Sequence, residues 1–141
     1  MLAKEILSET VPCLRTSDTA AKALQWMEVF RIKHLPIVND KELLGVISDV
    51  DIYDMNNPDE PIGNHELSLI RPYVFFDQHI YEVIELVSRL KLTIVPVLYK
   101  NKEYLGLIVL QDLIQEFANL SALKNPGGII VLELNERDYS L

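Results

Sequence analysis

Ser48 and Asp51 are the two side chains whose types and spacing best suit ligand binding. They lie three residues apart, where an apolar run gives way to a predicted helix, in the stretch Gly45-Val46-Ile47-Ser48-Asp49-Val50-Asp51. A ligand held here would contact this hydroxyl, this carboxylate and the free amides nearby. Ser48 or Asp49 can instead cap a helix that begins near Val50, because either oxygen accepts from an unpaired amide. Both interpretations stay open on the residues alone.

Two strands joined by a short turn are predicted directly before this motif. Ile37 and Val38 are apolar and β-branched, which favours a strand, and residues 39–42 (NDKE) form a turn-type cluster. The second run extends over residues 43–47 and is interrupted by Gly45. At such a glycine another backbone or a ligand can approach closely.

An amphipathic helix is predicted upstream of the two strands. Ser17 is its expected N-cap, and its apolar residues recur at the helical spacing i, i+3, i+4, i+7, namely Ala20, Ala23, Leu24 and Met27. Such a helix buries one face.

The whole pattern recurs 60 residues later. Pro12 aligns with Pro72, Ser17 with Asp77, residues 34–38 with 94–98, and the helical face with Ile80, Val83, Ile84 and Val87. One extra residue in the second turn raises the offset to 61, which aligns Asp51 with Asp112 but places Val109 where Ser48 should recur. The sequence therefore predicts an internal duplication whose copies bury faces against each other. We divide the chain into a first repeat (1–55), a polar linker (56–66), a second repeat (67–123) and a C-terminal tail (124–141).

Composition narrows the class of protein. The chain has 141 residues, 49% of them hydrophobic, which is ordinary for a globular domain. A net charge of −8 disfavours nucleic acid as a partner, and no apolar run is long enough for a membrane span. A single cysteine, Cys13, leaves no intramolecular disulfide and indicates a reducing, cytoplasmic location. The three histidines lack metal-ligand spacing.

The order of helix, HLPIV strand, turn and LLGVISDVD resembles the cystathionine-β-synthase-type (CBS) domain, and two tandem copies resemble a Bateman module. The resemblance covers about residues 1–123. It implies an α/β fold of the α+β kind, with two β-α-β-β-α repeats related by pseudo-twofold symmetry. It also implies a homodimer, and clefts between the repeats for adenine ligands such as AMP, ADP, ATP, S-adenosylmethionine or a cyclic dinucleotide.

The same resemblance implies the residues of each cleft. In the first, Asp51 would accept from the ribose hydroxyls and Ser48 would donate to a phosphate, with walls from Ile70, Arg71, Pro72, Leu92 and Thr93. In the second, Asp112 would hold the ribose beside Thr10, Val11, Ile32, Lys33 and His34. A phosphate in the second cleft would face the methyl groups of Val109, so we expect one competent cleft at most.

The C-terminal tail is predicted to begin as an apolar strand, GIIVLELNERDYSL (residues 128–141). It resembles the opening strand and first helical turn of an ACT-type domain, as in bacterial CBS–ACT proteins of the acetoin-utilisation type. This implies that the sequence is truncated within a further domain.

These observations predict a non-catalytic regulatory module that senses an adenine-type ligand and needs no cofactor or metal. The alternative is a structural dimerisation module with empty clefts that supports a missing C-terminal domain. A calcium loop over residues 49–60 is disfavoured, because Asp54 stands where the loop needs glycine. A serine nucleophile at Ser48 lacks the G-x-S-x-G elbow.

Overall fold

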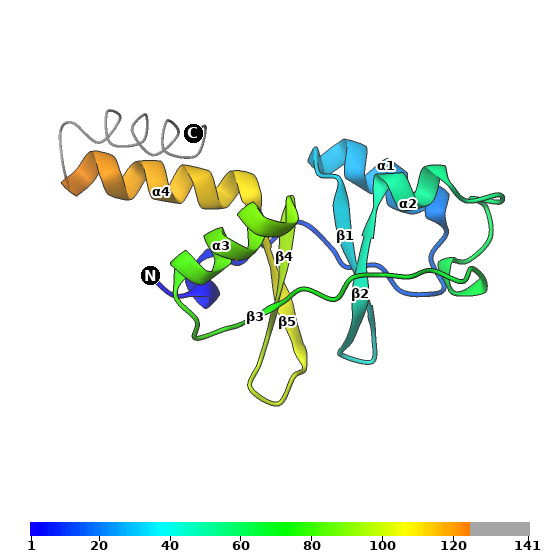
Figure 1. Ribbon diagram of the computed structural model, residues 1–141, viewed down its shortest axis with the longest axis horizontal. Helices are drawn as coiled ribbons and strands as arrows, with labels where there is room; N and C mark the ends of the chain where they lie inside the picture. Colours follow the sequence, from blue (N-terminus) through cyan, green and yellow to red (C-terminus); the bar gives the residue numbers. More distant parts are fainter. Residues whose placement is uncertain (125–141) are drawn as a thin grey trace.

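The computed structural model describes residues 1–124, with side chains through residue 120, and it consists of two similar copies side by side (Figure 1). The first copy contains α1 (Ala20–Phe30), β1 (His34–Asn39), β2 (Glu42–Ser48) and α2 (Asp49–Tyr53). The second contains β3 (Val74–Phe75), α3 (Ile80–Leu90), β4 (Ile94–Leu98), β5 (Tyr104–Val109) and α4 (Leu110–Lys124). Two short 3-10 helices are η1 (Ala3–Ile6) and η2 (Ile62–Asn64).

The strand pairing confirms the predicted duplication. β1 pairs antiparallel with β2, and β4 pairs antiparallel with β5. Each hairpin shifts register once, after Ile37 in the first copy and after the equivalent Val97 in the second. β3 runs parallel to β4, and Leu14 makes a parallel bridge to Ile37 at the equivalent place. Both copies therefore have the β-α-β-β-α order, with the opening strand of the first reduced to a single bridge.

The caps predicted for α1 and α3 were wrong by two residues, whereas Ser48 caps α2 as one of the predicted alternatives. Thr19 caps α1, since its side chain accepts from the Lys22 amide at 3.1 Å. His79, and not Asp77, caps α3. The first helix begins later than expected because Asp18 accepts from the Arg15 amide at 2.8 Å, which closes a turn before the helix.

Each copy is completed by a short segment that precedes the other copy. η1 hydrogen-bonds to the second copy, where the Ala3 amide donates to the Gln78 carbonyl at 2.9 Å. η2 makes the equivalent bond to the first copy, from the Ile62 amide to the Asp18 carbonyl at 2.8 Å. Ile62 is buried in the first core and Ala3 in the second. The two copies therefore exchange equivalent short helices.

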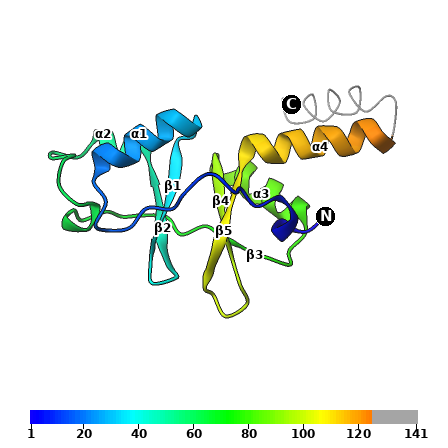
Figure 2. The same ribbon diagram turned by 180° about the vertical axis from the view of Figure 1, so that it is seen from behind.

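Two crossing segments carry this exchange along opposite faces of the molecule. The first crossing segment (residues 7–13) is in front in Figure 2, and the second (residues 65–73) is in front in Figure 1. The Ser8 amide donates to the Leu107 carbonyl of β5 at 2.8 Å, and the Val46 amide of β2 donates to the Ile70 carbonyl at 2.9 Å. Each crossing segment thus lies along the second hairpin strand of one copy.

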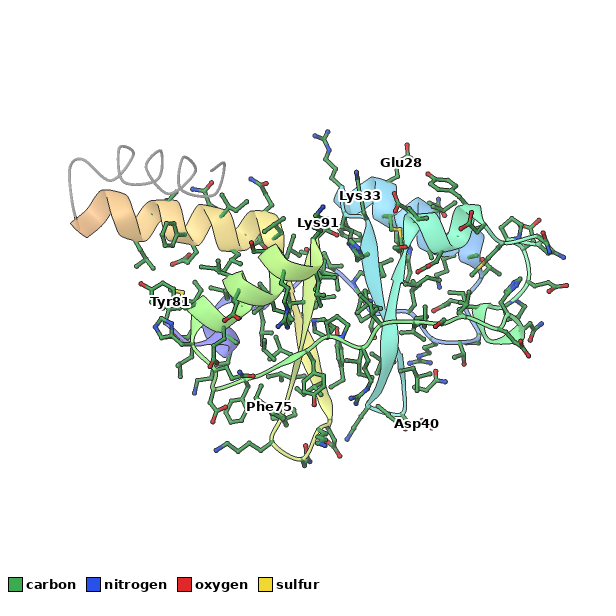
Figure 3. The ribbon with its side chains drawn as sticks, viewed as in Figure 1. Glu28, Lys33, Asp40, Phe75, Tyr81 and Lys91 are labelled. Carbon is green, nitrogen blue, oxygen red and sulfur yellow. The ribbon has the colours of Figure 1, made fainter. Side chains whose placement is uncertain are left out.

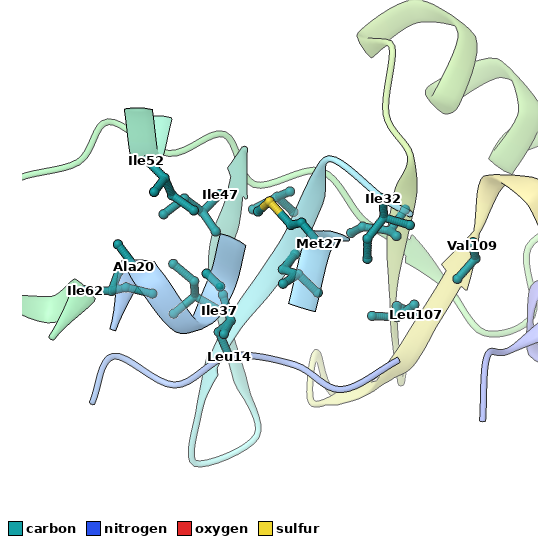
Figure 4. Packing of buried hydrophobic residues seen from close by; sticks show 14 residues of the cluster. Leu14, Ala20, Met27, Ile32, Ile37, Ile47, Ile52, Ile62, Leu107 and Val109 are labelled. Carbon is teal, nitrogen blue, oxygen red and sulfur yellow. The ribbon is translucent and has the colours of Figure 1, made fainter. Parts of the chain in front are cut away.

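The first core also contains side chains of the second copy. Figure 4 shows Leu107 and Val109 together with Ile32 in this cluster, to which Ile94 also belongs. The two copies therefore share one apolar junction. A separate cluster, built on α3 and on the β4–β5 hairpin, forms the core of the second copy.

Within residues 1–124, no helix combines the length and apolar character that crossing a membrane requires.

Gly45 and Gly106 make a matched test of the crossing segments. A Cβ at Gly45 would lie 2.8 Å from the Cβ of Leu69, whereas a Cβ at Gly106 would lie 3.5 Å from Leu7, an ordinary contact. We expect Gly45→Ala to lower the free energy of unfolding by about 1–3 kcal/mol through overpacking. Gly106→Ala should be neutral or stabilise by up to about 1 kcal/mol. Urea denaturation measures both, and equal effects would contradict the close approach at Gly45.

Candidate functional site

Ser48 and Asp51 form a reciprocal capping box at the start of α2. The Ser48 amide donates to Oδ2 of Asp51 at 2.9 Å, and the Asp51 amide donates to Oγ of Ser48 at 3.2 Å. This arrangement satisfies two backbone amides that the helix leaves unpaired. Because Oγ of Ser48 only accepts in this box, its proton remains available to a ligand. Among the described residues, Oδ1 of Asp51 has no hydrogen-bond donor, so it also remains available.

Asp51 lines a pocket of about 320 Å³ between α2 and the second crossing segment. This volume is at the lower end of the range for small-molecule sites. Three carboxylates, those of Asp51, Asp54 and Glu66, give the pocket an acidic wall. The other lining residues are Met55, Asn56, His65, Leu67 and Ser68.

The predicted wall residues Ile70, Arg71 and Pro72 are not among those that line this pocket. The crossing segment runs antiparallel to β2 and forms a bridge between Ile70 and Val46, two residues before Ser48. The residues after Ile70 therefore lie progressively farther from Ser48. Arg71 donates from Nε to the Leu43 carbonyl at 2.8 Å, and its guanidinium lies 5.1 Å from the ring centre of Tyr73. The sequence alone missed the preceding residues, 65–68, because nothing in it sets this register.

A second polar group lies next to the motif, at the junction of the copies. His34 is the register partner of Ser48, so the two side chains share one face of the hairpin. Nδ1 of His34 lies 2.8 Å from Oγ1 of Thr93, and the Lys33 amide donates to the same oxygen at 2.9 Å. The structure therefore brings Lys33, His34 and Thr93 together beside Ser48, although the resemblance assigned them to different clefts.

Cationic side chains also lie at this junction. Lys33 is the last residue of the turn between α1 and β1, and Lys91 is the first residue of the turn between α3 and β4. Figure 3 shows both on the side of the molecule that carries α1 and α4. Leu92 follows Lys91 but is buried in the second core, so it offers no open wall to a ligand.

The residues predicted for the second cleft are placed differently. Val109, the equivalent of Ser48, is only 8% exposed and packs in the shared junction, together with Ile32. Asp112 is exposed on α4, whose neighbour is η1. The amides of Thr10 and Val11 donate to Oγ of Ser8, and no hydrogen bond in the described part of the chain joins these residues to Asp112.

A larger pocket of about 470 Å³ lies at the far end of the hairpins, away from the motif. It is lined by Cys13, Arg15, Val38, Asn39, Asp40, Lys41 and Tyr104. Burial raises the pKa of the Tyr104 phenol, and it also raises the pKa of the Cys13 thiol, so both groups stay protonated near neutral pH. Cys13 is half-buried.

Within residues 1–124, no three His, Cys, Asp or Glu side chains are placed so that together they could hold a metal ion.

Comparison with known proteins agrees with this architecture. Residues 3–55 match the family model described as the CBS domain. A CBS domain pair/ACT domain protein from Thermotoga maritima is 20% identical and superposes with a TM-score of 0.71, over 82% of this chain and 95% of its own. A Vibrio cholerae protein described as the acetoin utilization protein AcuB is 22% identical, with a TM-score of 0.72 over 88% of this chain and 95% of its own.

A third structure, CBSX2 in complex with AMP, is 15% identical, with a TM-score of 0.67 over 82% of this chain and 94% of its own. At identities of 15–22%, these structures establish only the fold. The family model covers only the first copy. The strand predicted within residues 128–141, and its resemblance to an ACT domain, lie outside the described residues. Residues 3–55 are therefore a CBS domain, and the chain as a whole has the fold of a CBS domain pair.

Proposed function

We propose that this CBS domain pair is a regulatory module that binds an adenine nucleotide or a related adenosyl ligand at the first cleft, beside Ser48 and Asp51. The observation that carries the proposal is the state of these two side chains. The capping box holds both in place, yet it leaves the Ser48 proton and Oδ1 of Asp51 free. A diol that donates to Oδ1 would gain charge-assisted hydrogen bonds without disturbing the helix.

The pocket beside Asp51 has a size and lining that fit the nucleoside part of such a ligand. Met55 and Leu67 provide apolar surface for a base, and Ser68 adds a hydroxyl. The structure of CBSX2 in complex with AMP supports the ligand class, since that protein shares this fold. The predicted contacts with Ile70, Arg71 and Pro72 are replaced in this proposal by residues 65–68.

The charges around the pocket favour a ligand with little negative charge. The three carboxylates of the lining repel a polyphosphate. Arg71 offers no nearby compensation, because its guanidinium is bonded to the Leu43 carbonyl. Lys33 and Lys91 are the cations that Figure 3 shows at the junction. We therefore rank AMP and S-adenosylmethionine above ATP.

The proposed module binds its ligand without catalysing a reaction. Ser48 is held as a helix cap, and the ring nitrogen Nδ1 of its neighbour His34 faces Thr93 and not the hydroxyl. A general base must reach the proton that it removes. Binding would act by fastening the second crossing segment to α2, which joins the two copies more firmly.

Titration calorimetry on Asp51→Ala and Asp112→Ala tests the choice of cleft. We expect Asp51→Ala to weaken binding of AMP or S-adenosylmethionine about 10- to 100-fold, the usual effect of losing hydrogen bonds to a charged group. Asp112→Ala should bind as the wild type does. Ligand at a hundredfold excess over Kd should also stabilise the wild type by about 2.7 kcal/mol.

The control for folding is Asp51→Asn, which keeps a carbonyl oxygen for the Ser48 amide. It should retain the capping box and still bind more weakly than the wild type. No stabilisation by AMP, ADP, ATP, S-adenosylmethionine or cyclic di-AMP would favour the alternative, a structural dimerisation module with empty clefts.

Dimerisation is a second proposal, and apolar side chains on the outer helix faces support it. Tyr53 on α2 is 71% exposed, and Ile114 at the equivalent position of α4 is 52% exposed. Val29 on α1 and Val50 on α2 are also exposed, at 66% and 60%. Large apolar side chains exposed on neighbouring helices favour an interface between proteins if they form one surface.

Light scattering tests the proposed homodimer. We expect the wild type at about twice the chain mass of 16.2 kDa. The double variant Tyr53→Glu/Ile114→Glu should shift to the monomer, since it places charges in the contact. Tyr99→Glu, at an exposed aromatic residue in the β4–β5 turn, is the matched control and should stay dimeric. A wild type of monomer mass would refute the proposal.

A further inference from the structure

His34 and Thr93 form a partly buried polar contact at the junction between the copies. The Thr93 amide donates to Nδ1 of His34 at 3.2 Å, and Oγ1 of Thr93 lies 2.8 Å from the same nitrogen. The contact joins residues 59 positions apart in the chain. It therefore ties the beginning of β1 to the beginning of β4.

The direction of these bonds determines the protonation state of the ring. A backbone amide can only donate, so Nδ1 must present its lone pair, and the ring proton lies on Nε2. Oγ1 of Thr93 already accepts from the Lys33 amide at 2.9 Å, which leaves its own proton free to be donated to Nδ1. The contact as observed therefore requires neutral His34.

The pseudo-twofold symmetry shows that the fold does not need this contact. Ile94 occupies the position equivalent to His34, and it is fully buried in the first core. An apolar side chain therefore suffices at the equivalent place in the second copy. The histidine is a feature of the first copy alone.

We propose that His34 is a proton-sensitive latch between the two copies: neutral His34 holds Thr93, and protonation of Nδ1 releases the Thr93 amide and loosens the junction beside the first cleft. The latch does not depend on whether that cleft binds a ligand. Protonated Nδ1 could still donate to Oγ1 of Thr93, but it would face the Thr93 amide donor to donor. That amide would then lose its acceptor in a partly buried place.

The charged groups around the ring set the pH at which the latch opens. Asp49 and Asp51 face it from α2, Lys33 precedes it, and Lys91 stands in the turn before β4. Burial lowers the pKa of His34 below the ordinary value of 6.5, and Lys33 lowers the pKa further, while the two aspartates oppose this. The net direction is downward, so His34 is neutral at physiological pH.

Because the folded state lowers the pKa of His34, the free energy of unfolding decreases as the pH falls. As pH falls through 6.5, the unfolded chain takes up a proton on residue 34 before the folded chain does. The contribution of the latch is therefore complete above about pH 6.5 and is lost as pH falls toward the folded-state pKa. Thermal stability should decline over this interval.

NMR of the uniformly labelled, ligand-free chain tests the latch directly. From about pH 8 down to about pH 5, we expect the His34 ring resonances to titrate with a midpoint below 6.5. The ring nitrogens should report the Nε2–H tautomer at high pH. The backbone amide resonance of Thr93 should move with the same midpoint, which a merely structural histidine would not cause. A midpoint at or above 6.5, or a Thr93 amide that does not follow it, would overturn the proposal.

A matched pair of variants supplies the second measurement. His34→Asn keeps an acceptor for the Thr93 amide but cannot be protonated, so its melting temperature should decline less between about pH 7 and pH 5 than that of the wild type. His65→Asn changes a histidine away from the junction, whose Nε2 contacts the Asn57 carbonyl. It should keep the decline of the wild type. An equal decline in His34→Asn and in the wild type would also overturn the latch.

Discussion

Neither copy of this protein closes its own core, and the rest of the structure depends on that constraint. Ile62, from the segment before the second copy, fills a place in the first core, and Ala3, from the segment before the first copy, fills a place in the second. Backbone hydrogen bonds hold both short helices in equivalent positions. The chain must therefore cross between the copies twice, and each crossing segment lies against a hairpin strand at a glycine. The close approach at Gly45 brings residues 65–68 beside α2 and so creates the pocket.

The apolar junction between the copies removes the polar side chain from one of the two clefts. The residue that ends the second hairpin strand of each copy can cap the following helix or pack into the shared core. Ser48 caps α2 through its hydroxyl, whereas Val109 lies in the junction with Ile32. A capping hydroxyl stays partly exposed and keeps a proton to donate, but a buried valine offers only methyl groups. The difference between these two residues thus gives a pseudo-symmetric fold a single polar cleft.

The fold could be predicted from the sequence, because its signals recur at a constant offset. The aligned residues Ala20 and Ile80 begin α1 and α3, and the glycine between two apolar runs predicted the close approach that Leu69 makes. The contacts of the site could not be predicted in this way. The position of Arg71 depends on the register of an irregular segment against β2, which no local pattern encodes. By residue type Ser17 is at least as good a cap as Thr19, and only the turn closed by Asp18 favours Thr19.

The polar contact at the junction adds a directional bond to the contacts that align this nearly symmetric pair. Apolar side chains such as Ile94 and Leu107 align the copies by shape complementarity and have no directional preference of their own. A histidine that accepts from one specific amide does have such a preference, because a displaced Thr93 amide would be left without an acceptor. The same bond depends on pH, since the acceptor disappears when the ring takes up a proton. His34 is the register partner of Ser48, so a change in this bond occurs one side chain away from the capping box of the first cleft. This contact is one of several directional bonds between the copies, and it is the one placed to transmit a change between the junction and the cleft.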